Sequence, residues 1–317
     1  MKKIIAAVML LVMMLALASC GGAATYTMGT GGSAGTYYAF GGVLSNQIKT
    51  STGMDIKVVS TGGSKDNIIG IDTGDYQLGT VQSDVMAYAW AGSRSFEQNG
   101  KINSFRVIGG LYAEAVQLVT TNPDIKSVAD LEGKKVSIGD KGSGVYFNAV
   151  DVLASAGLTV DDIDAQYQSF ADSADNLKDR KIDAAFIVAG APTPAITELF
   201  TSNTAYLVPI DGVYADSLFE NCEYYTEYTI PAGTYPGQTE AVKTVTVKAT
   251  LIVSADATEE DVYNITKAIF DNIESITSAH AKGAELSIEN ATSGMTAPFH
   301  KGAAKYFAEK GITVDAQ

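Results

Sequence analysis

The chain has 317 residues and a formal net charge of −14 at neutral pH, from 22 basic and 36 acidic side chains. This excess of acid argues against a nucleic-acid-binding protein and against charge-driven adhesion to anionic lipid, since both need a basic surface. It does not exclude a small anionic ligand, because a local site can oppose the global field. The chain is long enough to bury a sizeable core, and we expect two lobes.

Residues 1–19 have the features of a bacterial lipoprotein signal peptide. Lys2 and Lys3 supply positive charge, an apolar core follows over 4–18, and Leu17-Ala18-Ser19-Cys20 matches a lipobox. The apolar core is shorter than the roughly 20 residues of a comfortable membrane span. The alternatives are an ordinary signal peptide, or a short span, with an accidental cysteine.

The lipobox predicts lipidation of Cys20, with residues 20–25 as a short tether. The mature protein is then extracytoplasmic and anchored by lipid to the outer face of the cell membrane. Lipidation leaves Cys222 as the remaining thiol, so we expect no disulfide within the mature chain, and stability must come from the core. We also expect a monomer.

From Tyr26 onward, strand-like and helix-like segments alternate, which predicts an α/β fold with mainly parallel sheets. Helix-start signals with the form of a capping box begin at Ser127, Thr159 and Thr258. After Thr258, apolar residues recur at helical spacing up to Ile276 and predict one amphipathic helix. The expected strands are residues 25–30, 55–60, 76–81, 105–111, 115–121, 134–139, 165–169, 183–188 and 244–254.

No linker or low-complexity run divides the chain, so a domain boundary must be a crossing between two lobes. Two segments suit a crossing: 111–116, where one apolar strand meets another, and 228–237, which is extended and rich in Pro and Gly. The predicted division is a discontinuous first lobe over 26–114 and 231–317, with an inserted second lobe over 115–230.

Three times an apolar strand runs through a Gly/Ser/Thr-rich loop directly into a helix-like segment, at residues 26–40, 56–70 and 135–149. Helix starts of this kind present free backbone N–H groups and a partial positive charge, which suit a small anion. Gln82-Ser83-Asp84 forms a fourth polar loop at a strand end. Two of the three glycine-rich loops fall in the first lobe and one in the second, so we expect them to face each other across a cleft.

Two nucleotide-binding interpretations of these loops fail in detail. The segment 29–34 formally fits a dinucleotide fingerprint, but the second strand ends in Ser60-Thr61-Gly62-Gly63 and not in an acid. The segment 139–144 lacks the Gly-Lys-Ser/Thr ending of a phosphate-binding loop. We therefore expect no cofactor. Simple turn geometry is the alternative explanation of each loop.

Glu114 is the most unusual acid, because it interrupts the largely apolar run 107–119 at the first proposed crossing. A charge there needs a partner, which is a ligand ammonium, a lysine or a set of backbone donors. A hinge-stabilising ion pair is the alternative role for this side chain.

Signals for catalysis and for metal binding are poor. Gly31-Gly32-Ser33-Ala34-Gly35 matches a nucleophile elbow, but no second motif supplies an oxyanion hole. The two histidines, His280 and His300, belong to no cluster with metal-ligand spacing. We expect neither an enzyme nor a metal site. A secreted enzyme with Ser33 as nucleophile and a surface adhesin are less favoured alternatives.

Several stretches, in order over nearly the whole mature chain, resemble the TAXI group of solute receptors, the extracytoplasmic binding proteins of tripartite ATP-independent periplasmic (TRAP) transporters. Two details depart from the pattern common in that group: Ala39 follows Tyr37-Tyr38 where proline is frequent, and 298–302 lacks the usual leucine and second proline. The matching stretches are GTGGSAGTYYAFGGVLS, STGGSKDNI, LGTVQSDV, LYAEAVQLV, SVADLEGKKVSIGDKGSG, KIDAAFIVAGAPTPAI, LVPIDG, YYTEYTIPAGTYPGQ and PFHKGAAKYFAEKGI.

The resemblance implies a two-lobed periplasmic-binding-protein fold of the Venus flytrap, type II-like kind, and delivery of a ligand to a TRAP permease driven by an ion gradient. The expected ligand is a small carboxylate, either a glutamate-like amino acid or a dicarboxylate. A lipoprotein that serves an ABC importer is the alternative in the same class. The expected ligand-binding residues are Gly32, Ser33, Thr36, Tyr37, Ser64, Lys65, Gln82, Ser83, Glu114, Ser143, Gly144, Tyr146, Gly190 and Tyr235.

Overall fold

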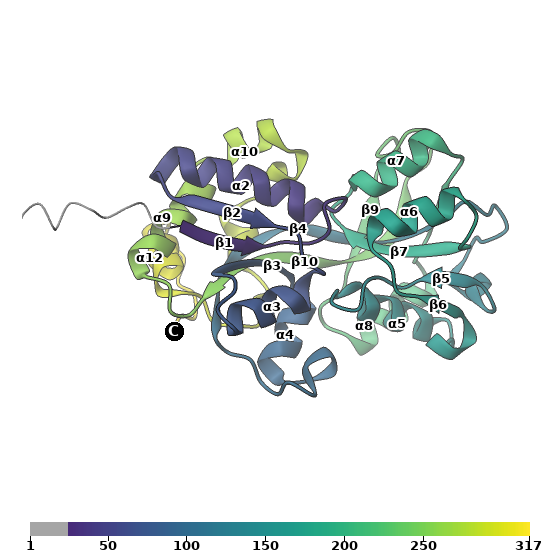
Figure 1. Ribbon diagram of the computed structural model, residues 1–317, viewed down its shortest axis with the longest axis horizontal. Helices are drawn as coiled ribbons and strands as arrows, with labels where there is room; N and C mark the ends of the chain where they lie inside the picture. Colours follow the sequence, from purple (N-terminus) through teal and green to yellow (C-terminus); the bar gives the residue numbers. More distant parts are fainter. Residues whose placement is uncertain (1–24) are drawn as a thin grey trace, which may run out of the picture.

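Two long strands cross the molecule and join its two α/β halves (Figure 1). They are β4 (Phe105–Thr120) and β10 (Val242–Ser254), which pair antiparallel in the middle of one ten-stranded sheet. The structure, a computed structural model, describes residues 25–317. The predicted signal peptide, Cys20 and most of the tether lie outside the described residues.

The first half contains three parallel strands beside β10, in the order β2-β1-β3-β10. Helices cover both faces of these strands (Figure 1). The elements are β1 (Thr25–Gly29), α2 (Thr36–Thr52), β2 (Asp55–Val59), α3 (Ser64–Asp72), β3 (Leu78–Gln82), α4 (Ser83–Ala91), η1 (Arg94–Phe96), α9 (Glu259–Phe270), α10 (Ile273–Ala279), η4 (Ala281–Glu285), α11 (Ile288–Thr292) and α12 (Lys301–Glu309).

The second half continues the sheet from β4 in the order β4-β7-β5-β6, with β8 paired to β4 and β9 paired to β10. The pairs β5–β6 and β5–β7 are parallel. The elements are η2 (Val128–Leu131), β5 (Lys135–Ser137), α5 (Val145–Ser155), η3 (Val160–Asp162), β6 (Asp164–Gln166), α6 (Phe170–Lys178), β7 (Ala184–Ala189), α7 (Pro194–Ser202), β8 (Tyr206–Val208), α8 (Val213–Asn221) and β9 (Thr226–Ile230).

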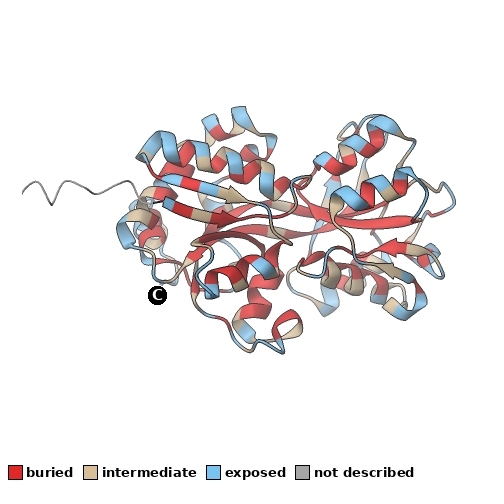
Figure 2. Ribbon diagram, in the orientation of Figure 1, coloured by how far each residue is buried: buried red, intermediate tan, exposed pale blue. Residues whose placement is uncertain are grey.

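The apolar core divides where the two long strands pass between the halves, and both strands are buried over most of their length (Figure 2). On β4, Tyr112 belongs to the core of the first half, whereas Ala115 and Val116 belong to the cores of the second. On β10, Val247 packs in the second half and Ala249 in the first. Each strand thus passes from the core of one half into the core of the other within two or three residues.

We therefore keep the two-lobe division as a proposal, with one boundary moved. We keep the first crossing at the predicted position, near residue 114. The return lies inside β10, near residue 248, because β9 and the first part of β10 pair with each other and pack in the second half. The extended segment 228–237 precedes this return.

Two local predictions need correction. The strands expected at 105–111 and 115–121 form one continuous strand, because the Glu114 side chain is accommodated by a hydrogen bond from Tyr37 and does not break the ladder. The helix expected after Thr258 is two helices, since α9 ends at Phe270 and α10 starts at Ile273. The capping boxes at Ser127 and Thr159 are confirmed, but each starts a short 3-10 helix.

Side-chain contacts also join the halves away from the crossing strands. Arg94 donates to both carboxylate oxygens of Asp151, at 2.6 and 3.0 Å, and lies over the rings of Tyr88 and Phe147. Nearby, Asn148 on α5 donates to Asp84 on α4 at 3.0 Å. Because these contacts link α5 to the α4 region, they hold the halves close on this side of the sheet.

The Arg94–Asp151 pair offers a test of this linkage. Asp151→Asn keeps the side-chain shape but removes the charge, and we expect urea denaturation to show a loss of about 1–2 kcal/mol. Raising salt to about 1 M should shrink that loss, because the pair is partly exposed. A double-mutant cycle with Arg94→Met isolates the pairwise energy. A coupling energy near zero would contradict the proposed link.

Candidate ligand-binding site

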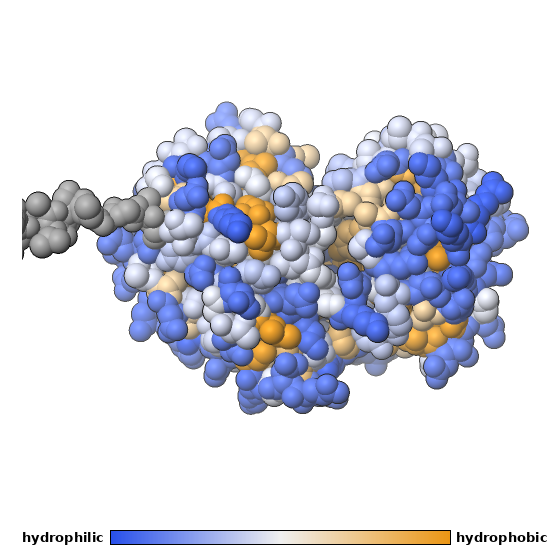
Figure 3. Space-filling model, in the orientation of Figure 1, coloured by the Kyte–Doolittle hydropathy of each residue, from blue (hydrophilic) through white to orange (hydrophobic). Residues whose placement is uncertain are grey.

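A cavity of about 340 Å³ lies between the two halves, beside the crossing strands. In the space-filling view the surface is notched between the halves (Figure 3). Polar loops make most of the wall, together with Phe170 and a few small apolar residues. The lining residues are Gly31–Tyr37, Ser60–Ser64, Gln82, Glu114, Asp140, Ser143–Val145, Gln168–Ala171, Val188 and Ala189.

The starts of four helices line this one cavity. α2 and α3 come from the first half, and α5 and α6 from the second. α2, α3 and α5 start after glycines, at Gly35, Gly63 and Gly144, and no side chain caps them. Their first-turn N–H groups therefore have no partner within the helix. All three glycine-rich loops singled out in the sequence contribute to this wall.

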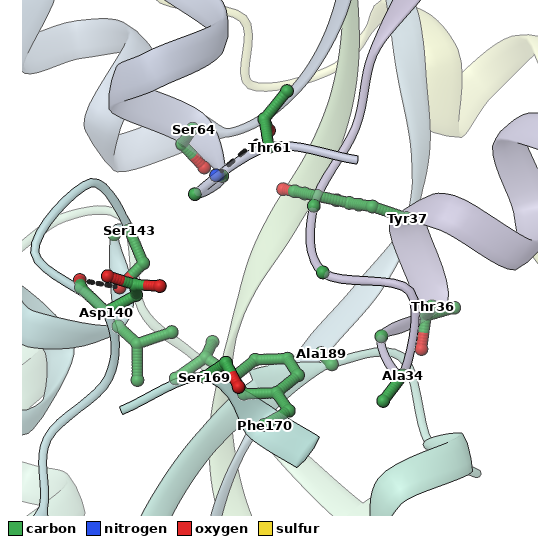
Figure 4. Close-up of a pocket in the computed structure, with 18 of the residues that line it drawn as sticks. Ala34, Thr36, Tyr37, Thr61, Ser64, Asp140, Ser143, Ser169, Phe170 and Ala189 are labelled. Atoms are coloured by element: carbon green, nitrogen blue, oxygen red, sulfur yellow. Dashed lines mark hydrogen bonds between the residues drawn. The ribbon is translucent and has the colours of Figure 1, made fainter. Parts of the chain in front are cut away.

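The close-up shows how the two walls face each other (Figure 4). Tyr37 points from α2 into the space between the halves, with Thr61 and Ser64 on one side. Ser143 and Asp140 lie opposite, on the loop before α5. Gly62 and Gly63 approach this loop closely, because a Cβ on them would lie 3.5 Å from the Cα of Gly142 and of Ser143, respectively.

Most of the residues predicted to bind ligand meet at this cavity. Their contact with a ligand stays a prediction. They come from the first loop, the start of α3, the end of β3, the crossing strand and the loop before α5. They are Gly32, Ser33, Thr36, Tyr37, Ser64, Gln82, Glu114, Ser143 and Gly144.

Lys65 and Tyr146 lie outside the cavity lining. They line a separate surface pocket of about 390 Å³ at the junction of the halves. The Lys65 ammonium lies 5.7 Å from the Phe96 ring centroid, and Tyr146 lies 6.1 Å from the Tyr167 ring. Each directly follows a residue that lines the cavity, but the turn of the helix points its side chain away from the cavity.

Ser83, Gly190 and Tyr235 support the walls without lining the cavity. The Ser83 hydroxyl accepts the backbone N–H of Lys248 at 3.2 Å and ties α4 to β10. The Gly190 carbonyl accepts a 2.7 Å bond from Thr36, which joins the start of α2 to the second half. Tyr235 is buried, and its hydroxyl accepts the Thr193 N–H at 3.0 Å.

Asp140, Thr61 and the segment 168–171 line the cavity but were missing from the predicted residues. Ser169 caps α6 by accepting the Asp172 N–H at 3.2 Å. Ser169 ends the expected strand 165–169 and Asp172 comes three residues later, so the capping pattern was a usable signal. Asp140 lies next to a predicted loop, but an exposed acid beside glycines has no distinctive pattern.

Glu114 is the buried acid of the site, with 2% of its surface exposed. Its Oε2 accepts a hydrogen bond from the Tyr37 hydroxyl at 2.7 Å. Burial raises the pKa of Glu114 to about 8, against the lowering effect of the Tyr37 bond and of Lys282, while the charge of Asp84 raises it further. Burial and the neighbouring Glu114 also hold the pKa of Tyr37 well above its ordinary value.

The cavity contains acids but no basic side chains. Among the described residues that line it, none is Lys, Arg or His, whereas Glu114 and Asp140 carry carboxyl groups. The nearby Lys282 is buried and pairs with Glu285 at 2.5 Å. Any anionic group held here must therefore depend on uncharged donors, which are backbone N–H groups, hydroxyls and the side-chain amides of Gln82 and Gln168.

The geometry gives no support for the hydrolase and metal alternatives. Ser33 lines the cavity without a histidine, because His280 and His300 both serve as helix N-caps elsewhere. Within residues 25–317 no group of three His, Cys, Asp or Glu side chains is arranged for a metal ion. In the same part of the chain, no helix has both the length and the apolar character that a membrane crossing requires.

The two walls already approach to contact at Gly144. A Cβ there would overlap the Gln82 amide oxygen and lie 2.6 Å from a methyl group of Val85. Gln82 in turn donates to Asn148 at 3.1 Å across the same junction. The two halves can thus lie this close together only because Gly144 has no side chain.

Gly144→Ala should keep the halves from approaching this closely. We expect small-angle scattering to give a larger radius of gyration than for the wild type, with each half still folded by circular dichroism. The matched control is Gly42→Ala, at a position in α2 where a Cβ meets nothing within 4 Å. It should leave the scattering unchanged. Identical scattering of Gly144→Ala and wild type would contradict a steric role for this glycine.

Comparison with known proteins agrees with the architecture described above. The NMT1-like family matches residues 28–311. The alkanesulfonate-binding protein SsuA from Xanthomonas axonopodis pv. citri, bound to MOPS, is 15% identical over 90% of this chain and 91% of its own, with a TM-score of 0.52. The ligand-binding component of an ABC-type import system from Staphylococcus aureus, with zinc bound, is 9% identical over 92% and 94%, also with a TM-score of 0.52.

A third solved structure, a putative L-cystine ABC transporter from Listeria monocytogenes, is 17% identical over 83% of this chain and 98% of its own, with a TM-score of 0.51. At these identities the likeness shows the fold, and the two-lobed periplasmic-binding-protein fold predicted from the sequence is confirmed. These comparisons do not single out the TAXI group among solute-binding proteins, so that resemblance is not confirmed. On the match over nearly its whole described length, the chain belongs to the NMT1-like family.

Proposed function

We propose that the protein is an extracytoplasmic solute-binding receptor that captures a small carboxylate-bearing ligand between its two halves and delivers it to a membrane transporter. The observation that carries this proposal is the meeting of uncapped helix starts from both halves at one cavity. Unpaired N–H groups and the positive ends of helix dipoles stabilise a small anion. No catalytic arrangement competes for this site.

Ligand binding would also hold the halves together. Carboxylate oxygens placed between α2 and α3 on one side and α5 on the other accept hydrogen bonds from both walls. The hydroxyls of Ser33, Ser64 and Ser143 are available on the same walls. Because these bonds form fully only when the halves are close, binding energy favours the closed state.

The class of transporter is a second part of the proposal. The sequence resemblance predicts a TRAP permease driven by an ion gradient. The names of the L-cystine and Staphylococcus aureus neighbours instead refer to ABC systems, which favours the alternative of an ABC importer. We therefore place the ABC importer first and keep the TRAP permease as the competing candidate.

A thermal-shift screen tests the ligand class. We expect at least one small carboxylate, among amino acids, dicarboxylates and monocarboxylates, to raise Tm in a concentration-dependent way, because a ligand that binds the folded state alone stabilises it. Calorimetry should then give a stoichiometry of one. A screen in which sulfonates, sugars or polyamines raise Tm and no carboxylate does would contradict the carboxylate proposal.

Uptake into proteoliposomes tests the transporter class. The receptor is added to vesicles that hold the membrane proteins encoded beside its gene, with a ligand from the screen. An ABC importer requires ATP hydrolysis and works without an ion gradient. Uptake that persists without ATP and stops when the ion gradient is collapsed would contradict the ABC assignment and favour the TRAP permease.

Lipid anchoring at Cys20 belongs to the proposal as well, since this residue lies outside the described part of the chain. We expect Cys20→Ser to move the protein from the membrane fraction to the soluble extracytoplasmic fraction, because the variant lacks the thiol that carries the lipid. Cys222→Ser is the matched control and should remain with membranes. A Cys20→Ser protein that still fractionates with membranes would contradict the anchor.

A further inference from the structure

We propose that Glu114 receives a positively charged group of the ligand, and that a ligand ammonium replaces a proton on this carboxyl group when it binds. The inference rests on the proposed function and narrows its ligand class to amino acids, as opposed to dicarboxylates. Binding is then coupled to the release of a proton. The position of Glu114, its partners and the charges around the cavity support each step.

Glu114 combines burial, access to the cavity and the lack of a cationic partner. It lines the cavity, and 2% of its surface is exposed. Its hydrogen-bond partner in the structure is the neutral Tyr37 hydroxyl, and no ion pair with it occurs in the described part of the chain. A buried carboxylate without a cation is unfavourable, so the group stays protonated until a cation arrives.

Lys282, the lysine that could act as a cationic partner of Glu114, already forms an ion pair with Glu285. Lys282 is 3% exposed, pairs with Glu285 and lies over the ring of Tyr112, 5.8 Å from its centroid. The Glu285 carboxylate also accepts the backbone N–H of Ala113 at 2.7 Å. If Lys282 moved toward Glu114, the Glu285 carboxylate would lose its cationic partner. A cation for Glu114 must therefore come from the ligand.

The other titratable groups near Glu114 also favour its protonated form in the absence of a ligand cation. The hydroxyls of Tyr37 and Tyr112 are neutral, with pKa values held well above the ordinary value by burial and by Glu114. Asp84 on α4 is buried behind Gln82, and Asp140 lies across the cavity. Lys248 on β10 directs its ammonium to the carbonyls of residues 290 and 293 and away from Glu114. The surroundings of Glu114 are thus acidic or neutral on every side except at the committed Lys282.

This arrangement separates two ligand classes. An amino acid places its carboxylate at the helix starts and its ammonium at Glu114, so one ligand satisfies both kinds of group. A dicarboxylate places its second carboxylate in a cavity with two acids and no base, and Glu114 must stay protonated. The two classes therefore differ in pH dependence, because an amino acid releases the Glu114 proton on binding and a dicarboxylate leaves it in place.

The sign follows from the pKa of about 8 for Glu114 in the ligand-free protein. Between about pH 6 and pH 8 the free protein holds the proton, and an ammonium bound to Glu114 displaces it. Amino-acid affinity should rise with pH in this window, by up to about tenfold per unit. Dicarboxylate affinity should stay nearly constant over most of this window and fall only as pH rises through about 8.

The experiment uses two matched series of probes: L-glutamate, glutarate and 4-aminobutyrate, and L-leucine, 4-methylpentanoate and 3-methylbutylamine. Calorimetry at pH 7 in phosphate and in Tris reports proton release from the difference in apparent enthalpy. We expect an amino acid to bind at least tenfold more tightly than its partner without the amine, with release of close to one proton.

Glu114→Gln should lower amino-acid affinity about 10- to 100-fold and abolish the proton release. The matched control, Glu240→Gln, alters an exposed acid in the loop before β10 and should change neither quantity. The ligand-free variant provides a check on folding. Its Tm should exceed that of the wild type at pH 8 by about 2–4 °C or more and equal it at pH 4. The wild-type fold must keep Glu114 protonated while the unfolded chain ionises it, and this cost grows as pH rises from about 4.5 toward 8.

The outcomes separate this inference from the proposed function. Carboxylates without an amine that bind as tightly as amino acids, unaffected by Glu114→Gln, would overturn the inference and leave the carboxylate proposal standing. Binding of 3-methylbutylamine, which has no carboxylate, as tightly as L-leucine would support the role of Glu114 and overturn the carboxylate proposal. Failure of every probe in both series would overturn both.

Discussion

The backbone N–H groups at the start of an α-helix have no partner inside the helix, and the rest of this site depends on where those groups are directed. In α2, α3 and α5 the preceding residue is a glycine, so no side chain satisfies the N–H groups locally. Each of the three helices ends up with its start at the same cavity, although they come from both halves of the molecule. An anionic group of a ligand is the partner that satisfies several of them together.

The crossing strands explain how the helix starts come to face each other. β4 and β10 run from one core into the other without interruption, so the two halves share one twisted sheet at their junction. The glycines at the junction then set how closely the walls approach. Gly63 lies in contact with Ser143 and has a φ of +112°, which favours glycine, and Gly144 lies so close to Gln82 that a side chain would overlap it. Small residues in these loops thus serve both the exposure of the N–H groups and the contact between the halves.

Glu114 gives the site its polarity. It occupies the crossing strand where the cores change, and its carboxyl group faces the cavity with Tyr37 as its hydrogen-bond partner. In our proposal, the helix starts hold the anionic end of a ligand and the buried Glu114 holds its cationic end. Such an arrangement selects for a molecule that carries both charges, although the protein as a whole is strongly acidic.

Much of this arrangement could be predicted from the sequence, because its signals are local. Glycine-rich loops before helices, alternation of strands and helices, and the isolated Glu114 in an apolar run each depend on neighbouring residues. The position of the return crossing could not be predicted, since it depends on β9 pairing with β10 after a loop. Lys65 and Tyr146, which the sequence predicts to bind ligand, lie outside the cavity lining, because the direction of a side chain on the first turn of a helix depends on how that helix packs. Asp140 was missed for lack of a pattern.

A crystal structure with a ligand from the thermal-shift screen tests the central claim most directly. The account predicts carboxylate oxygens within hydrogen-bond distance of backbone N–H groups at the starts of α2 or α3 and of α5, with residues of both halves in contact with one ligand. A ligand bound outside this cavity, or bound inside it with its carboxylate held by lysine or arginine side chains and not by the helix starts, would contradict the account.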